Sequence, residues 1–115
     1  MGLCKFRLMR IIARRTLRQF IDTLAGHRDQ QAVKGALDAW YDEVSKAEWE
    51  SSSEVRRSYV TASIISADRI VLNIKGNDYR LIVSVDFGKS IVWVKWIGSH
   101  KDCDRIDARK VSYGE

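Results

Sequence analysis

The chain has 115 residues and a mass of 13.2 kDa, enough for one domain with one modest hydrophobic core. Hydrophobic residues make up 45% and charged residues 30% of the sequence, which excludes an intrinsically disordered chain. The absence of proline excludes a polyproline linker, and no apolar stretch approaches the roughly 20 residues of a membrane span. We therefore expect a single domain over residues 1–115 with no membrane association.

The basic side chains outnumber the acidic ones, 20 to 15, which gives a net charge of +5 and an isoelectric point near 9.4. Residues 1–21 carry six basic and no acidic side chains, whereas residues 22–67 carry five basic and eight acidic ones. Residues 68–115 carry nine basic and seven acidic side chains. A basic balance favours a polyanionic partner. We expect the basic surface to involve the first segment and the second half of the chain.

Cysteine and histidine are sparse. Cys4 and Cys103 are far apart in sequence and form no disulfide framework, which is typical of a reducing, cytoplasmic environment. Together with His27 and His100 they show no zinc-ligand spacing, so we expect no metal site.

The N-terminal part predicts a short extension followed by a helix. Residues 1–8 are expected to precede the folded unit, and Met9–Ala13 is a candidate short strand. Thr16 and Gln19 fit a capping box at the start of a helix, and Gly26 is a plausible stop. Apolar residues then recur on one helical face: Leu17, Phe20, Ile21 and Leu24.

A second helix is predicted from about Asp29 to Ala47, and the short connection before it favours an antiparallel helical hairpin. Ser51 and Glu54 have the spacing to cap a further short helical turn. The second helix keeps its apolar period over about four turns: Val33, Ala36, Leu37, Trp40, Val44 and Ala47.

After residue 68 the apolar period changes to two, which predicts strands over Arg69–Lys75, Tyr79–Asp86 and Ser90–Gly98. The turn between the first two contains Gly76 and Asn77. The last strand is apolar on both faces, as expected for an inner strand. The sequence therefore predicts an α+β domain in which two N-terminal helices pack on an antiparallel sheet, followed by a polar tail with a short helix or loop.

The predicted strands carry basic and aromatic side chains next to each other. Tyr79 adjoins Arg80, and Trp93 and Trp96 flank Lys95. Cations neutralise phosphates and exposed rings stack on unpaired bases, so this pattern is compatible with nucleic-acid binding. A solvated charged face above core aromatic residues explains the same pattern.

Two further features have the side chains for phosphate chemistry. A tight hairpin would bring Lys75 and Arg80 close together, either as two cations around one phosphate or as two exposed charges beside a turn. His100 follows the most apolar strand, and imidazole exchanges protons near neutral pH. An equally good interpretation is that His100 is a structural loop histidine that hydrogen-bonds to a backbone carbonyl. His27 is assigned no role, and we do not expect Cys103 to be a nucleophile because nothing near it in sequence activates a thiol.

The order of motifs resembles the HigB-type toxins of the RelE-like mRNA interferase superfamily, from about Met9 to Asp107. The resemblance is carried by several short segments: Met9-Arg-Ile-Ile12, Leu37-x-x-Trp40-Tyr41, Ala47-Glu-Trp49, Asn73-Ile-Lys-Gly-Asn-Asp-Tyr-Arg-Leu-Ile82 and Trp96-Ile-Gly-Ser-His-Lys-Asp-Cys-Asp-Arg-Ile-Asp107. It implies a twisted antiparallel sheet with helices on one side. It also implies a cytoplasmic, ribosome-dependent endoribonuclease that cuts translated mRNA without a metal or other cofactor and arrests growth.

The resemblance also implies partners and residue roles. The partner would be a HigA-like helix-turn-helix antitoxin, and operator DNA would be bound only through the toxin–antitoxin complex. Arg80 and Lys75 would stabilise the charged phosphate, and His100 would act as acid or base with Lys101 beside it. Four further residues are candidates to contact RNA: Lys95, Tyr79, Asn77 and Arg105.

One position departs from the family pattern, because Cys103 stands where these toxins usually have a tyrosine. A thiol lacks the ring that a tyrosine offers for stacking on a base. Tyr79 or Tyr113 is a possible substitute. Two alternatives therefore stay open: a catalytically weak or silent relative that binds RNA or the antitoxin, and a basic nucleic-acid-binding domain of other ancestry.

Overall fold

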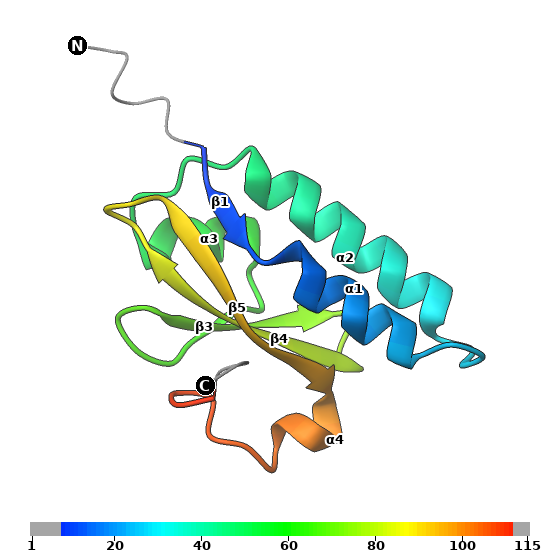
Figure 1. The fold of residues 1–115 in the computed structure, drawn as a ribbon. Coiled ribbons are helices and arrows are strands. Elements are labelled where there is room, and N and C mark those ends of the chain that lie inside the picture. The colour runs from blue at the N-terminus through cyan, green and yellow to red at the C-terminus, as the bar shows by residue number, and fades with distance from the viewer. Residues whose placement is uncertain (1–7, 112–115) are drawn as a thin grey trace.

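Residues 8–111, which the computed structural model describes, form an α+β structure around a five-stranded mixed sheet (Figure 1). The predicted extension falls almost entirely on residues 1–7, and these, like Tyr113, lie outside the described part. In chain order the elements are β1 (Arg10–Ile12), α1 (Arg14–Thr23), α2 (Gln30–Ser45), α3 (Ser52–Ser58), β2 (Ser63–Ile64), β3 (Arg69–Ile74), β4 (Tyr79–Asp86), β5 (Ile91–Ser99) and α4 (His100–Cys103).

The strand order in the sheet is β1-β5-β4-β3-β2. The predicted antiparallel meander of β3, β4 and β5 is confirmed, with β5 as an inner strand. The prediction of a purely antiparallel sheet is wrong, because β1 pairs with β5 in parallel and places Arg10 opposite Ile91. The apolar pattern of the three-residue strand β1 does not show whether it runs parallel or antiparallel to its neighbour. The two-residue edge strand β2 was not predicted at all.

Helices α1 and α2 run side by side along one side of the sheet (Figure 1). Helix α1 begins at Arg14, two residues before the predicted cap. Its N-cap position is Ala13 and makes no side-chain hydrogen bond, so the predicted capping role of Thr16 is wrong. Thr16 instead lies within the first turn, where its backbone N–H donates to the Ala13 carbonyl at 3.1 Å.

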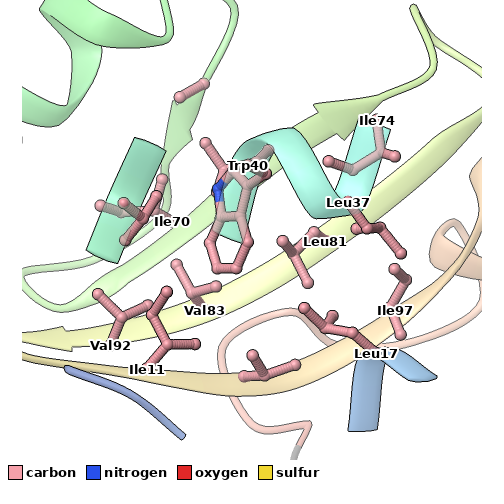
Figure 2. Packing of buried hydrophobic residues seen from close by; sticks show 14 of the residues in the cluster. Ile11, Leu17, Leu37, Trp40, Ile70, Ile74, Leu81, Val83, Val92 and Ile97 are labelled. Atoms are coloured by element: carbon pink, nitrogen blue, oxygen red, sulfur yellow. The ribbon is translucent and has the colours of Figure 1, made fainter. Parts of the chain in front are cut away.

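One apolar cluster joins the helices to the inner face of the sheet (Figure 2). Leu37 and Trp40 of α2 point toward the strands, where Leu81 and Val83 of β4 are buried. Leu81 has no solvent-exposed surface, and truncating such a side chain to alanine costs about 2–5 kcal/mol. This cluster fixes the positions of the loops at the ends of the strands.

The opposite, outer face of the sheet carries a different set of side chains: Arg69, Val71, Asn73, Arg80, Ile82, Ser84, Trp93 and Trp96. Val71 and Ile82 are buried although they do not belong to the core cluster. The chain after α4 returns toward this face (Figure 1). It is held there by Arg69, whose Nη1 donates to the carbonyls of Ala108 at 3.0 Å and Val111 at 2.8 Å.

Candidate functional site

A cleft of about 540 Å³ forms where three connections between elements meet. Its walls are the α1–α2 connection, the β3–β4 hairpin and the junction of β5 with α4. Each connection supplies three consecutive lining residues: 27–29, 77–79 and 99–101. The predicted residues Asn77, Tyr79, His100 and Lys101 are thus brought together in one place.

Asp29 lies between two walls of this cleft. The Tyr79 hydroxyl donates a 3.0 Å hydrogen bond to Oδ2 of Asp29, and Lys75 Nζ lies 3.5 Å from its Oδ1. The hydrogen bond from Tyr79 and the charge of Lys75 hold the pKa of the Asp29 carboxyl below its usual range. Burial and the hydrogen bond to Asp29 raise the pKa of the Tyr79 phenol. The carboxylate therefore stays charged and ties the helical hairpin to the β-hairpin.

Lys75 is bound by carboxylates in this structure. Its Nζ donates a 2.8 Å hydrogen bond to Asp78 Oδ2 in addition to the ion pair with Asp29. The hydrogen bond to Asp78 is the main reason why the pKa of Lys75 is raised. Lys75 has a left-handed backbone, with a φ of 53°, and it follows the last residue of β3. The alternation of side chains along β3 stops at Ile74, so it does not place Lys75 beside Arg80 as predicted.

His100 stands at the start of α4, directly after β5. Its backbone N–H donates to the Asp78 carbonyl at 2.9 Å, which joins this wall of the cleft to the β3–β4 hairpin. Nε2 of the ring lies 3.7 Å from a carboxylate oxygen of Asp104. Nδ1 has no hydrogen-bond partner among residues 8–111. Nδ1 is also buried, so although the side chain is 42% exposed, a ligand in the cleft does not reach this nitrogen in the present arrangement.

No role was predicted for His27, yet it lines the same cleft as His100. Its Nδ1 accepts a 3.0 Å hydrogen bond from the backbone N–H of Asp29. Because Nδ1 is an acceptor, the neutral ring carries its proton on Nε2. Arg28 and Asp29 also line the cleft and were missed. The one sequence feature that could have indicated them is their position between two predicted helices, because the residues that contact Asp29 are distant in sequence.

Arg80 does not line this cleft: it belongs to the outer face of the sheet, where it lies opposite Gly98 in β5. Its Nη1 donates a 3.2 Å hydrogen bond to the Asn77 carbonyl. Cys103 is close enough to Arg80 for this charge to lower the thiol pKa, but burial outweighs the effect and raises it. The thiol is therefore protonated at neutral pH, as the sequence led us to expect.

The remaining predicted RNA contacts lie outside the cleft. Lys95 falls at an irregularity in the pairing of β4 with β5, and its Nζ lies 5.7 Å from the centre of the Trp93 ring. Arg105 is exposed after α4. The ring of Trp96 lies against Gly98, since a Cβ added to Gly98 would lie 2.5 Å from its Cη2. These side chains form a second group, on or beside the outer face.

Residues 8–111 contain neither a membrane-spanning helix nor a cluster of metal ligands. No helix there is long and apolar enough to cross a bilayer. Among residues 8–111, no group of three or more His, Cys, Asp or Glu side chains has an arrangement that could hold a metal ion.

Comparisons with known proteins bear on this arrangement. Residues 33–106 match the family model HigB_toxin, the RelE-like toxic component of a toxin-antitoxin system. The matched range includes two walls of the cleft but not the α1–α2 connection that contributes His27 and Asp29. No curated protein matches the chain. Because the family match covers more than half of its length, the chain belongs to the HigB family of RelE-like toxins, the toxic components of toxin–antitoxin systems.

Proposed function

We propose that this toxin is a ribosome-dependent mRNA endoribonuclease and that the cleft at His100 is its active site. The observation that carries the proposal is the convergence of His100, Lys101, Asn77 and His27 from three separate connections. The lining combines imidazole, amide, ammonium and guanidinium groups with the carboxylates of Asp29 and Asp78, and such a polar cleft suits a phosphodiester better than an apolar ligand.

The reaction proposed is an attack by the ribose 2′-oxygen on the adjacent phosphorus. A bond forms between that oxygen and phosphorus while the bond from phosphorus to the 5′-oxygen breaks. A base must accept the 2′-proton and an acid must protonate the departing 5′-oxygen, so protons balance without any co-reactant. Cations must stabilise the additional negative charge on the phosphorus oxygens in the transition state.

His100 is the candidate acid or base in this scheme. Its side chain lines the cleft and is 42% exposed, and its position as the first residue of α4, directly after β5, fixes its backbone at the edge of the cleft. Asp104, 3.7 Å from Nε2, is placed to stabilise the ring when it is protonated. His27 is the second candidate for proton transfer or phosphate binding, through its Nε2–H.

The cations differ in their availability. Lys101 is exposed at the cleft, and Arg28 is also exposed there, with its Nε 3.9 Å from Asp29. Arg80, implied by the family resemblance, approaches from the outer face by way of Asn77. Lys75 contributes only where a phosphate displaces its carboxylate partners. We therefore place Lys101 and Arg80 before Lys75 as phosphate-stabilising groups.

Substrate RNA is proposed to extend from the cleft onto the outer face. Trp93 is 37% exposed and carries Lys95 above its ring, which suits stacking on a base beside a phosphate. Asn77 and Arg105 are exposed and remain candidate contacts. Tyr79 is buried edge-on against Phe20, so we assign it a positioning role through its hydroxyl rather than a stacking role.

The proposal includes the partners that the family resemblance implies. In the cytoplasm, the toxin would act on mRNA held by the ribosome and would be neutralised by a HigA-like helix-turn-helix antitoxin. Operator DNA would be contacted only through that complex. The second candidate function is a silent relative, which is favoured by Cys103 at the position of the family tyrosine.

Induced expression in a bacterial host tests the proposal. We expect growth arrest, and mapping of mRNA 5′ ends should show cuts within translated codons but not in an untranslated copy of the same transcript. Arg80→Ala combined with His100→Ala should abolish both effects. Unchanged toxicity of this double variant would show that the site is wrongly assigned.

The silent alternative needs a separate variant. If the wild type does not cleave mRNA but Cys103→Tyr does, the chain is a silent relative. If the wild type cleaves mRNA and the rate of Cys103→Tyr differs from the wild-type rate by less than about tenfold, the chain is an active enzyme.

A further inference from the structure

A second concave surface lies at the opposite end of the strand order from β1, between α3 and the edge strand β2. This α3–β2 groove has a volume of about 650 Å³ and is lined by Ser52, Ser53, Arg56, Arg57, Val60 and Ile64. It shares no lining residue with the cleft at His100. Its residues are therefore not needed for the proposed chemistry.

The floor of the groove is apolar and exposed. Val60 is 74% exposed and Ile64 is 40% exposed, and both are among the most exposed large apolar side chains of residues 8–111. Isolated exposed apolar residues are common, whereas here two of them lie together in one concave groove.

An open sheet edge adjoins this floor. β2 pairs with β3 on one side, and within the described residues no strand pairs with its other edge. An unpaired edge offers backbone N–H and C=O groups to an incoming extended segment, in the way that many domains bind peptides by adding a strand.

The other wall of the groove is basic and rigid. Arg56 and Arg57 are exposed, and neither has a carboxylate partner among residues 8–111. Val55 anchors the helix in the core, and Tyr59 donates a 2.6 Å hydrogen bond to Glu43 in α2. The two guanidinium groups therefore stand on a fixed support beside the apolar floor.

We propose that the α3–β2 groove binds an acidic, partly apolar segment of the antitoxin, which adds to the free edge of β2 in extended form. Unpaired arginines next to an apolar floor complement carboxylates next to apolar side chains. Nucleic acid fits less well, because Val60 and Ile64 offer it no charge and no stacking surface. The inference rests on membership of a toxin–antitoxin family and not on the nuclease activity.

Calorimetry on full-length proteins tests the proposal, with a product of a reading frame adjacent to the gene of this chain assayed as the antitoxin. Arg56→Glu with Arg57→Glu should weaken the Kd at least tenfold, because the charge that faces the acidic segment is reversed. Val60→Lys should also weaken it, although it adds a positive charge. The matched control is Arg15→Glu with Arg18→Glu, the same charge change on the exposed side of α1, which should leave the Kd within about twofold.

The same variants separate the other possible occupants. Wild-type Kd values for both groove variants, with unchanged melting temperatures, would overturn the proposal. It would also be overturned if the groove variants lost affinity for a fluorescent single-stranded RNA but kept the antitoxin, or if they only dissociated a homodimer seen by sedimentation. None of these readouts requires cleavage, so failure of the nuclease proposal would leave this test intact.

Discussion

The Tyr79 hydroxyl donates a 3.0 Å hydrogen bond to Asp29, a residue 50 positions away in sequence. Asp29 precedes the first residue of α2 and Tyr79 is the first residue of β4, so this contact joins two walls of the cleft. Tyr79 is buried, and the Asp29 side chain is only 18% exposed. Their bond fixes the hairpin that carries Asn77 against the connection that carries His27.

Removing this bond should lower stability without unfolding the protein. Tyr79→Phe keeps the ring against Phe20 but deletes the hydroxyl, and we expect the melting temperature to fall by roughly 4 °C. Tyr41→Phe is the matched control, because the Tyr41 hydroxyl has no hydrogen-bond partner among residues 8–111. Equal melting temperatures for the two variants would show that the Tyr79 bond does not contribute.

The same pair predicts a pH dependence. The pKa of Asp29 is lowered from its ordinary 3.8, so its contribution to stability is present above pH 3.8 and is lost as the pH falls through the lowered value. The pKa of Tyr79 is raised from 10.0, so its contribution is present below pH 10.0 and is lost as the pH rises through the raised value.

The difference in melting temperature between wild type and Tyr79→Phe should therefore be constant from about pH 5 to 9 and should shrink outside that window. Thermal unfolding followed by circular dichroism across this range measures it. A difference that grows on acidification would contradict the assignment.

Cys103 should react slowly with alkylating agents. Burial raises the pKa of its thiol, and only the thiolate reacts quickly. In a Cys4→Ser background, the iodoacetamide rate should reach half of its maximum at a higher pH than the rate of free cysteine. A fast reaction at pH 7 would contradict this. For the same reason, Cys103→Ser should keep cleavage within about threefold of the wild type.

Gly98 is predicted to be intolerant of a side chain. In Gly98→Ala the new Cβ would lie 2.5 Å from Trp96, so the indole must leave its place on the outer face. We expect a cost of about 1–3 kcal/mol in urea unfolding and a shift in tryptophan fluorescence. Gly35→Ala is the control, because no atom lies within 4 Å of a Cβ there, and it should stabilise α2 by about 0.5–1 kcal/mol. If both variants behaved alike, Trp96 would not be in contact with Gly98.

The elements with a long, clean apolar period were predictable. β4 was predicted with its observed bounds because its inward residues, such as Leu81 and Val83, all reach the core cluster. The last strand was displaced by only one residue, and its inner position followed from its two apolar faces. Helix α1 was found but its start was not, because its N-cap residue is Ala13, which has no capping side chain that a sequence pattern could reveal.

The site residues were predictable only where their positions depend on neighbouring residues in the sequence. His100 and Lys101 were found because a loop after a buried strand has a rigid support. The partners of Lys75 were not, since Asp29 reaches it through tertiary packing and the left-handed backbone of Lys75 ends the strand period. His27 was missed for the same reason, because its place in the cleft depends on how two hairpins meet.

We have proposed that the cleft at His100 cleaves mRNA on the ribosome. The most direct measurement is the single-turnover rate of mRNA cleavage in a reconstituted translation system, with wild type, His100→Ala and the exposed control Arg15→Ala. We expect cleavage that requires the ribosome, a loss of about 100-fold or more for His100→Ala and a wild-type rate for the control. A wild-type rate for a correctly folded His100→Ala would contradict it.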